Sequence, residues 1–339
     1  MKAYCNLLAL EKGLDPGGQA TAFETLILLE APLPWRSDLY TTVGTMPQEV
    51  LDLYALYMQR YHETGVWPPI YLLLIAPDEA YSQPGCRRVI RFQREGAQIA
   101  HFARAEYFVP EAQTGPLIWT LAEEPGRLGE FAGWQTAVSP TPRDLLVCTH
   151  GTVDAACAKF GFPLYHYLRR QHASDQLRVW RVSHFGGHVF APTLMELPSG
   201  HFWAYVEEAQ ADQIARRAGP VAALRGHYRG WAGLANGFLQ ATERELWLCA
   251  GWRWFDWPKR GKILVQDEAA QPTWAEVCIE FDDGGGTQLY QARVEVSGHV
   301  EMIHTTGGTG TYAYPQYKIV SLAPGVWETA VNKTLMYQA

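Results

Sequence analysis

The predicted secondary structure repeats itself along the first two thirds of the sequence. Apolar runs and helical spacing predict, in order, a strand, a helix and three strands at residues 23–30, 47–65, 69–76, 86–95 and 98–109. The same order returns at residues 144–150, 153–171, 178–184, 188–198 and 201–206. A further helix at 207–219 closes the second unit, with Gly219 and Pro220 as stop signals. This plan is typical of thioredoxin-like domains of the α/β (α+β) class, and its repetition predicts a duplicated lobe.

The chain has 339 residues, which is long enough for two or three hydrophobic cores. We expect an N-terminal thioredoxin-like lobe at 1–140, a second thioredoxin-like domain at 141–220 and a C-terminal extension at 221–339. Residues 110–142, rich in proline and glycine, are interpreted as a connecting segment. In the extension, residues 222–252 have a helix-like pattern, and strands are predicted at 262–266, 274–281, 288–296 and 315–322.

Composition and charge exclude several classes of protein. The formal net charge is −7 and the longest basic run spans only 258–262, so no nucleic-acid partner is expected. No apolar run approaches the roughly 20 residues that span a bilayer, and the first residues do not resemble a secretory signal. We therefore expect a cytoplasmic protein whose six cysteines are reduced and serve as ligands or core residues.

Two cysteines and two histidines form the pattern that carries chemistry. Cys148 and Cys157 are nine residues apart, one at the end of a predicted strand and the other near the start of a helix. Helix N-termini lower the pKa of thiols and so favour the thiolate that a metal needs. His184 and His188 flank Gly186 and Gly187, which predict a loop that approaches a cofactor closely.

Four such ligands suit either a structural zinc ion or a 2Fe-2S cluster, and the residues alone leave both possibilities open. Zinc sites commonly use shorter spacings between paired cysteines than the eight intervening residues here. The spacing therefore favours the cluster, with a zinc-stabilised binding module as the alternative.

Several other residues have weaker claims to a role. His150 is the main rival ligand, but we interpret it as either holding a ligand in place or serving only the structure. Asp154 is expected to cap the following helix, or else to orient His150. The remaining cysteines have no partner within motif distance, and no C-x-x-C motif occurs; they are Cys5, Cys86, Cys249 and Cys278. The aromatic stretch 252–257 fits core packing or a docking surface.

Specific motifs connect the sequence to a known family. The chain contains C-x-H-G-x-x-D-x-x-C at 148–157, W-R-V-S-H-F-G-G-H-x-F-A-P-T at 180–193 and Y-R-G-W-A-G at 228–233. In these motifs the sequence resembles the sucrase/ferredoxin-like family. The resemblance covers most of 20–235 and is strongest over 145–205, so the last hundred residues inherit nothing from it.

The resemblance implies a thioredoxin-like 2Fe-2S ferredoxin domain at 141–220, with the cluster on Cys148, Cys157, His184 and His188 and no ligands in the preceding lobe. The expected function is electron transfer rather than catalysis, so no catalytic residues are assigned. A flavin or ferredoxin reductase would be the electron donor to an unidentified acceptor. Sugar hydrolysis, which the family name suggests, is disfavoured because the carboxylate pairs 207–208 and 282–283 are adjacent and point apart.

Two neutral imidazoles in place of two thiolates remove two negative charges from such a cluster. The reduction potential is therefore expected to lie above the roughly −400 mV of plant-type clusters, between that class and the Rieske clusters or in the lower Rieske range. An imidazole that gains basicity on reduction also couples proton uptake to the electron, so the potential should fall as pH rises.

Overall fold

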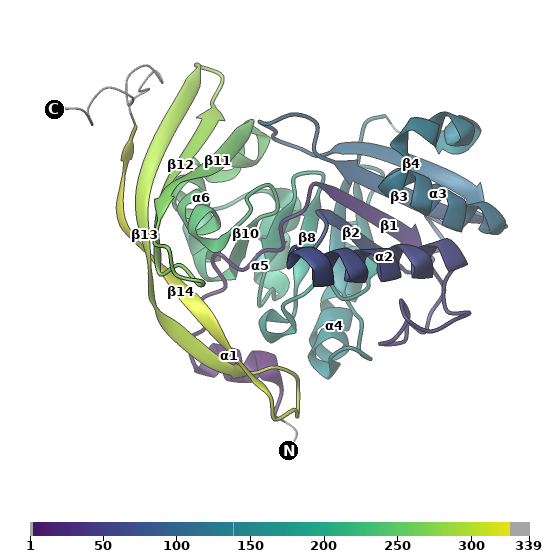
Figure 1. Ribbon diagram of the computed structural model, residues 1–339, viewed down its shortest axis with the longest axis horizontal. Coiled ribbons are helices and arrows are strands. Elements are labelled where there is room, and N and C mark those ends of the chain that lie inside the picture. Colours follow the sequence, from purple (N-terminus) through teal and green to yellow (C-terminus); the bar gives the residue numbers. More distant parts are fainter. Residues whose placement is uncertain (1–2, 138, 326–339) are drawn as a thin grey trace.

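A computed structural model describes residues 3–137 and 139–325 of the chain. These residues form a ten-stranded mixed sheet with helices packed on it, and a separate four-stranded antiparallel sheet at one side (Figure 1). The mixed α/β class expected from the sequence is confirmed.

The first lobe has the predicted order, with β1 (Thr25–Glu30), α2 (Gln48–Thr64), β2 (Ile70–Ile75), β3 (Cys86–Gln93) and β4 (Ala103–Pro110). Strand β1 pairs in parallel with β2 and antiparallel with β3, and all its residues are buried, on both faces of the sheet. Its side chains alternate between two cores, with Leu26 and Leu28 in one and Ile27 and Leu29 in the other. This explains why residues 26–29 of the strand form a continuous apolar run.

The second lobe repeats this arrangement, with β6 (Arg143–Cys148), α4 (Ala155–Gln171), β7 (Leu177–Val182), β8 (Leu194–Leu197), β9 (His201–Trp203) and α5 (Glu208–Arg216). The spatial order is β2-β1-β3-β4 in the first lobe and β7-β6-β8-β9 in the second, with matching directions. An antiparallel contact between β2 and β7 joins the two sets, at Ile75 and Val182, into one sheet. The sheet is thus two thioredoxin-like halves side by side, whereas the domain boundaries at 140 and 220 stay a prediction.

Two sequence predictions are wrong. The segment 110–142 contains helix α3 (Glu111–Glu123), the 3-10 helix η1 (Pro125–Trp134) and the short strand β5 (Gln135–Thr136), rather than a plain connection. Helix α3 was not predicted because proline and glycine are frequent in this segment, and Pro116 lies inside the helix. Its Leu117 and Ile118 are buried.

Residues 222–252 do not form one helix either. They contain the end of a 3-10 helix η3 (Val221–His227), the sheet-edge strand β10 (Tyr228–Trp231) and only then α6 (Gly237–Ala250). Strand β10 pairs with β9 and is fully buried, so tertiary contacts override its local pattern.

The C-terminal extension is β-rich as predicted, with β11 (Lys259–Gln266), β12 (Trp274–Asp282), β13 (Thr287–Ile303) and β14 (Thr311–Pro324). Helix α6 packs between this sheet and the main one, and both contribute to one hydrophobic core. The aromatic stretch 252–257 lies largely in the 3-10 helix η4 (Gly251–Asp256), where Trp254 and Phe255 are fully buried. These two aromatic side chains therefore serve the core and are not a docking surface.

Candidate metal centre

The two predicted cysteine ligands come from neighbouring elements of the second lobe. Cys148 is the last residue of β6, and Cys157 lies in the first turn of α4. The Asp154 side chain accepts a hydrogen bond of 2.8 Å from the backbone N–H of Ala156 and so caps this helix, as predicted. Gly161 lets α4 approach the strand closely, because a Cβ there would overlap the carbonyl oxygen of Cys148. Both thiols are buried.

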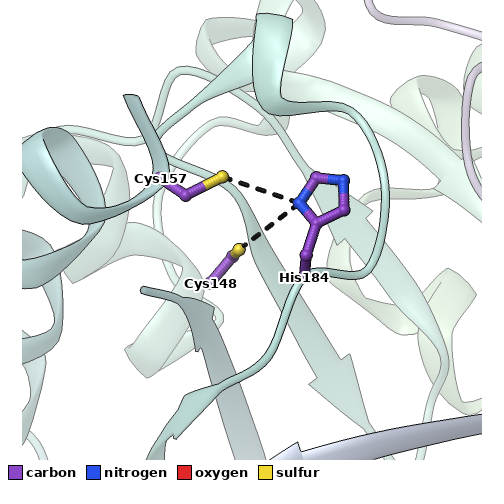
Figure 2. A group of neighbouring side chains, drawn as sticks. All are labelled: Cys148, Cys157 and His184. Carbon is purple, nitrogen blue, oxygen red and sulfur yellow. Dashed lines mark hydrogen bonds between the residues drawn. The ribbon is translucent and has the colours of Figure 1, made fainter. Parts of the chain in front are cut away.

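His184 follows β7, the parallel neighbour of β6, and therefore emerges at the same edge of the sheet as Cys148. Gly186 and Gly187 adopt φ values of +83° and +76°, which turn the chain back as the glycine loop predicts. The ring directs Nδ1 at both sulfurs, 3.8 Å from Cys148 Sγ and 3.6 Å from Cys157 Sγ (Figure 2). These three ligand atoms lie within 4.8 Å of one another.

His188 adjoins this group but faces a second set of side chains. It begins the short 3-10 helix η2 (His188–Phe190), and its ring centroid lies 5.4 Å from that of His184. Its Nδ1 is 3.4 Å from Cys5 Sγ and 3.5 Å from Asp154 Oδ2. Since Nδ1 is engaged there, Nε2 is the nitrogen left for a metal. The structure thus brings three of the four predicted ligands together and places the fourth beside them.

His150, the rival ligand, has both ring nitrogens engaged with the backbone. Its Nδ1 accepts the N–H of His184 at 3.2 Å, which leaves Nε2 protonated and 3.2 Å from the carbonyl oxygen of Arg36. Burial lowers the pKa of His150, which agrees with this neutral tautomer. His150 thereby holds the backbone of His184 against the loop at residue 36, which agrees with a supporting role rather than ligation.

The electrostatics of the cysteine pair favour one thiolate. Burial alone would raise the pKa of the Cys148 thiol, but hydrogen bonds from Cys157 and His184 hold it well below its ordinary value. The pKa of Cys157 is raised well above its ordinary value, first by its hydrogen bond to Cys148 and then by burial. Of the two thiols, Cys148 is therefore the one that loses its proton more readily. Two buried sulfurs and imidazole nitrogens are a soft donor set that suits zinc or an iron–sulfur cluster.

Burial lowers the pKa of His188 to about 4, although the nearby Asp154 opposes this shift. His188 is consequently neutral at physiological pH, as a metal ligand must be. Burial raises the pKa of the Cys5 thiol to about 11, so Cys5 is protonated.

Sequence reasoning missed two residues at this site, Cys5 and Thr306. Cys5 belongs to α1 (Cys5–Glu11) and Thr306 to the turn between β13 and β14, and both contact Asp154 and each other. Neither lies in a motif, and both are far from 148–188 along the chain. We find no pattern in the sequence that would have pointed to either residue.

A comparison with known proteins assigns the chain to a family. The sequence model of the sucrase/ferredoxin-like family matches residues 16–230. The chain belongs to the sucrase/ferredoxin-like family. Searches of curated proteins and of solved structures found no significant match.

The span shared with the sucrase/ferredoxin-like family contains all four predicted ligands together with His150 and Asp154. It leaves out α1 and everything after Gly230, including α6 and the four-stranded sheet. Among the described residues, no helix combines the length and hydropathy needed to cross a membrane.

Proposed function

We propose that this protein transfers electrons through a 2Fe-2S cluster held by Cys148, Cys157, His184 and His188. The observation that carries the proposal is the buried group of Cys148, Cys157 and His184, with their ligand atoms within 4.8 Å of one another. Membership of the sucrase/ferredoxin-like family supports it.

A bound cluster would supply reversible one-electron chemistry. The residues around it determine the charge of the site and its access to water. Two neutral imidazoles leave the oxidised site two negative charges short of an all-cysteine site, which makes electron uptake easier. Cys148 and Cys157 are each about 1 % exposed and belong to the large core around the main sheet, which keeps water from the sulfur side.

His184 is the more open of the two imidazoles and has its Nδ1 on the sulfur side, which leaves Nε2 to hold a proton. Reduction adds negative charge near this ring and raises its basicity. We therefore propose that His184 is where the chain gives up or takes up the proton that accompanies the electron.

We further propose a flavin or ferredoxin reductase as the electron donor and an unidentified protein as the acceptor, in the cytoplasm.

A structural zinc ion is the second candidate, and one observation favours it. Tetrahedral zinc with bonds of about 2.0 to 2.3 Å places its ligand atoms about 3.3 to 3.8 Å apart. The distances of 3.6 and 3.8 Å from His184 Nδ1 to the two sulfurs fall in that range. On this alternative the protein is a zinc-stabilised binding module.

Spectroscopy of protein purified without oxygen separates the two candidates. A cluster gives visible absorption that bleaches on reduction, a paramagnetic signal in the reduced state only, and hyperfine coupling from histidine nitrogen in that signal. Zinc gives a colourless protein with no signal in either state, which would contradict the proposal.

A further inference from the structure

The C-terminal extension reaches the candidate metal centre. Figure 1 shows β13 and β14 running as a long hairpin down one side of the molecule to α1. Lys12, just after α1, donates to the carbonyl oxygen of Glu301 at 2.7 Å, and Met302 packs in one buried cluster with Cys5, Val189 and Phe190. The turn at 304–310 thus lies against the elements that carry His188.

Thr306, in this turn, binds the carboxylate of Asp154 twice. Its hydroxyl donates to Oδ1 at 2.6 Å and its backbone N–H donates to Oδ2 at 2.8 Å. The same hydroxyl accepts the backbone N–H of Cys5 at 3.3 Å. One threonine therefore ties the hairpin, α1 and the start of α4 together at a carboxylate that is only 3 % exposed.

The arrangement fixes which way the Asp154 carboxylate faces. Oδ1 serves the helix cap and the threonine hydroxyl, while Oδ2 is held by the threonine N–H and lies 3.5 Å from His188 Nδ1. A carboxylate beside one nitrogen of a ligating histidine fixes the ring and makes the other nitrogen a better ligand. His304, from the same turn, adds an edge contact to the His188 ring, with centroids 5.8 Å apart.

We propose that Thr306 and Asp154 are positioning residues that hold His188 with Nε2 toward the metal, so that the C-terminal hairpin is part of the metal centre. The inference rests on the proposed function, since it takes His188 as a ligand. It goes beyond the sucrase/ferredoxin-like match, because Thr306 lies outside residues 16–230. It also assigns a role to the C-terminal extension, in whose sequence we recognise no functional motif.

Asp154 alone cannot test this idea, because it also caps α4. Thr306→Val is the sharper change, since it removes only the hydroxyl and leaves the cap between Asp154 and Ala156 in place. Thr306→Ser restores the hydroxyl and is the rescue variant. Thr309→Val makes the same substitution at an exposed position of the same turn, and is the matched control.

The experiment measures how fast a chelator removes iron from anaerobically purified full-length proteins, together with the histidine nitrogen coupling in the reduced state. Thr306→Val should release iron at least about tenfold faster than the unaltered protein, the scale seen when a partner of a ligating histidine is lost. Its nitrogen coupling should change as well, while Thr306→Ser and Thr309→Val stay close to the unaltered protein. Asp154→Asn, which keeps a cap acceptor, should behave like Thr306→Val.

Unchanged release and unchanged coupling in Thr306→Val, with iron and sulfide present in all samples, would overturn the positioning role alone. Equal effects in Thr306→Val and Thr309→Val would also overturn it, because the hairpin would then act only through its fold. Absence of iron and sulfide from the unaltered protein is a different failure, which overturns the proposed function. Thermal unfolding of each variant confirms that the comparison is made on folded protein.

Discussion

The hydroxyl of Thr306 lies 2.6 Å from Oδ1 of Asp154, although 152 positions separate the two residues. Thr306 stands in the turn of the C-terminal hairpin, and Asp154 caps the helix that carries Cys157. The surroundings of His188 are therefore assembled from the N-terminal helix, the second thioredoxin-like half and the C-terminal extension.

Removal of a proposed sulfur ligand should abolish metal binding. Cys148→Ala takes away the thiol at the end of β6, and we expect iron to fall from about two per chain to near zero, because the proposed cluster loses one of its two cysteine ligands. Cys278→Ala is the matched control, because Cys278 is also buried but lies in β12 of the separate sheet. Metal analysis of both variants checks this; iron retained by Cys148→Ala would exclude it as a ligand.

Exchange of an imidazole for a thiolate should lower the reduction potential. His184→Cys keeps a metal ligand but adds one negative charge to the oxidised site, and we expect the potential to fall by about 100 mV, part of the gap between Rieske and plant-type clusters. The exposed His166→Cys on α4 gains a thiol without altering the site. Potentiometric titration gives the reduction potential of each variant. An unchanged potential in His184→Cys would count against ligation by His184.

The potential should also depend on pH. A histidine ligand that binds a proton more tightly in the reduced state takes one up with the electron, so the potential falls as pH rises above the pKa of the oxidised form. Titrations between about pH 6 and pH 10 test this, a window that begins near the ordinary histidine pKa of about 6.5. A flat line over that window would rule out proton coupling, and the slope should be smaller in His184→Cys.

The close approach of α4 to β6 should be sensitive to a single methyl group. Gly161→Ala places a Cβ against the Cys148 carbonyl oxygen, so the helix and with it Cys157 must move outward. Overpacking of this kind costs about 1 to 3 kcal/mol. We expect a lower melting temperature and reduced iron content. Gly226→Ala, where a Cβ meets nothing within 4 Å, should leave both unchanged.

A buried histidine away from the metal centre should make stability depend on pH. Burial, then the charges of Lys259 and Arg217, hold the pKa of His201 well below its ordinary value, and neither ring nitrogen has a hydrogen-bond partner among the described residues. A depressed pKa contributes stability above the unfolded value of about 6.5, which is lost as pH falls below it, by up to about 1.4 kcal/mol per pH unit.

His201→Leu removes this titration. Urea unfolding at several pH values should show that the free energy of unfolding falls less steeply below pH 6.5, an ordinary histidine pKa, in the variant than in the unaltered protein. Parallel pH curves for the two proteins would show that His201 does not titrate in this range.

Much of the fold followed from local patterns because its elements are regular. Strands β1 and β6 contain continuous apolar runs, at 26–29 and 145–148, that are buried in the sheet, and α4 begins after a strong capping residue, Asp154. Helix α3 was missed because Pro116, a residue that usually ends helices, lies inside it. Strand β10 was missed because it depends on pairing with β9.

The candidate site was predictable only where its residues lie within one motif region. Cys148, Cys157 and His184 are carried by adjacent elements of one lobe, so spacing and resemblance sufficed to group them. Thr306 and Cys5 reach Asp154 through the packing of the hairpin and α1 at opposite ends of the chain. No local pattern encodes such a contact, because it depends on how the extension folds back.

The content of iron, acid-labile sulfide and zinc in one anaerobically purified sample tests the central claim most directly. The proposed function predicts about two irons and two sulfides per chain and little zinc, as a 2Fe-2S cluster requires. About one zinc per chain without sulfide would contradict it and assign the cysteines and histidines to a structural metal site.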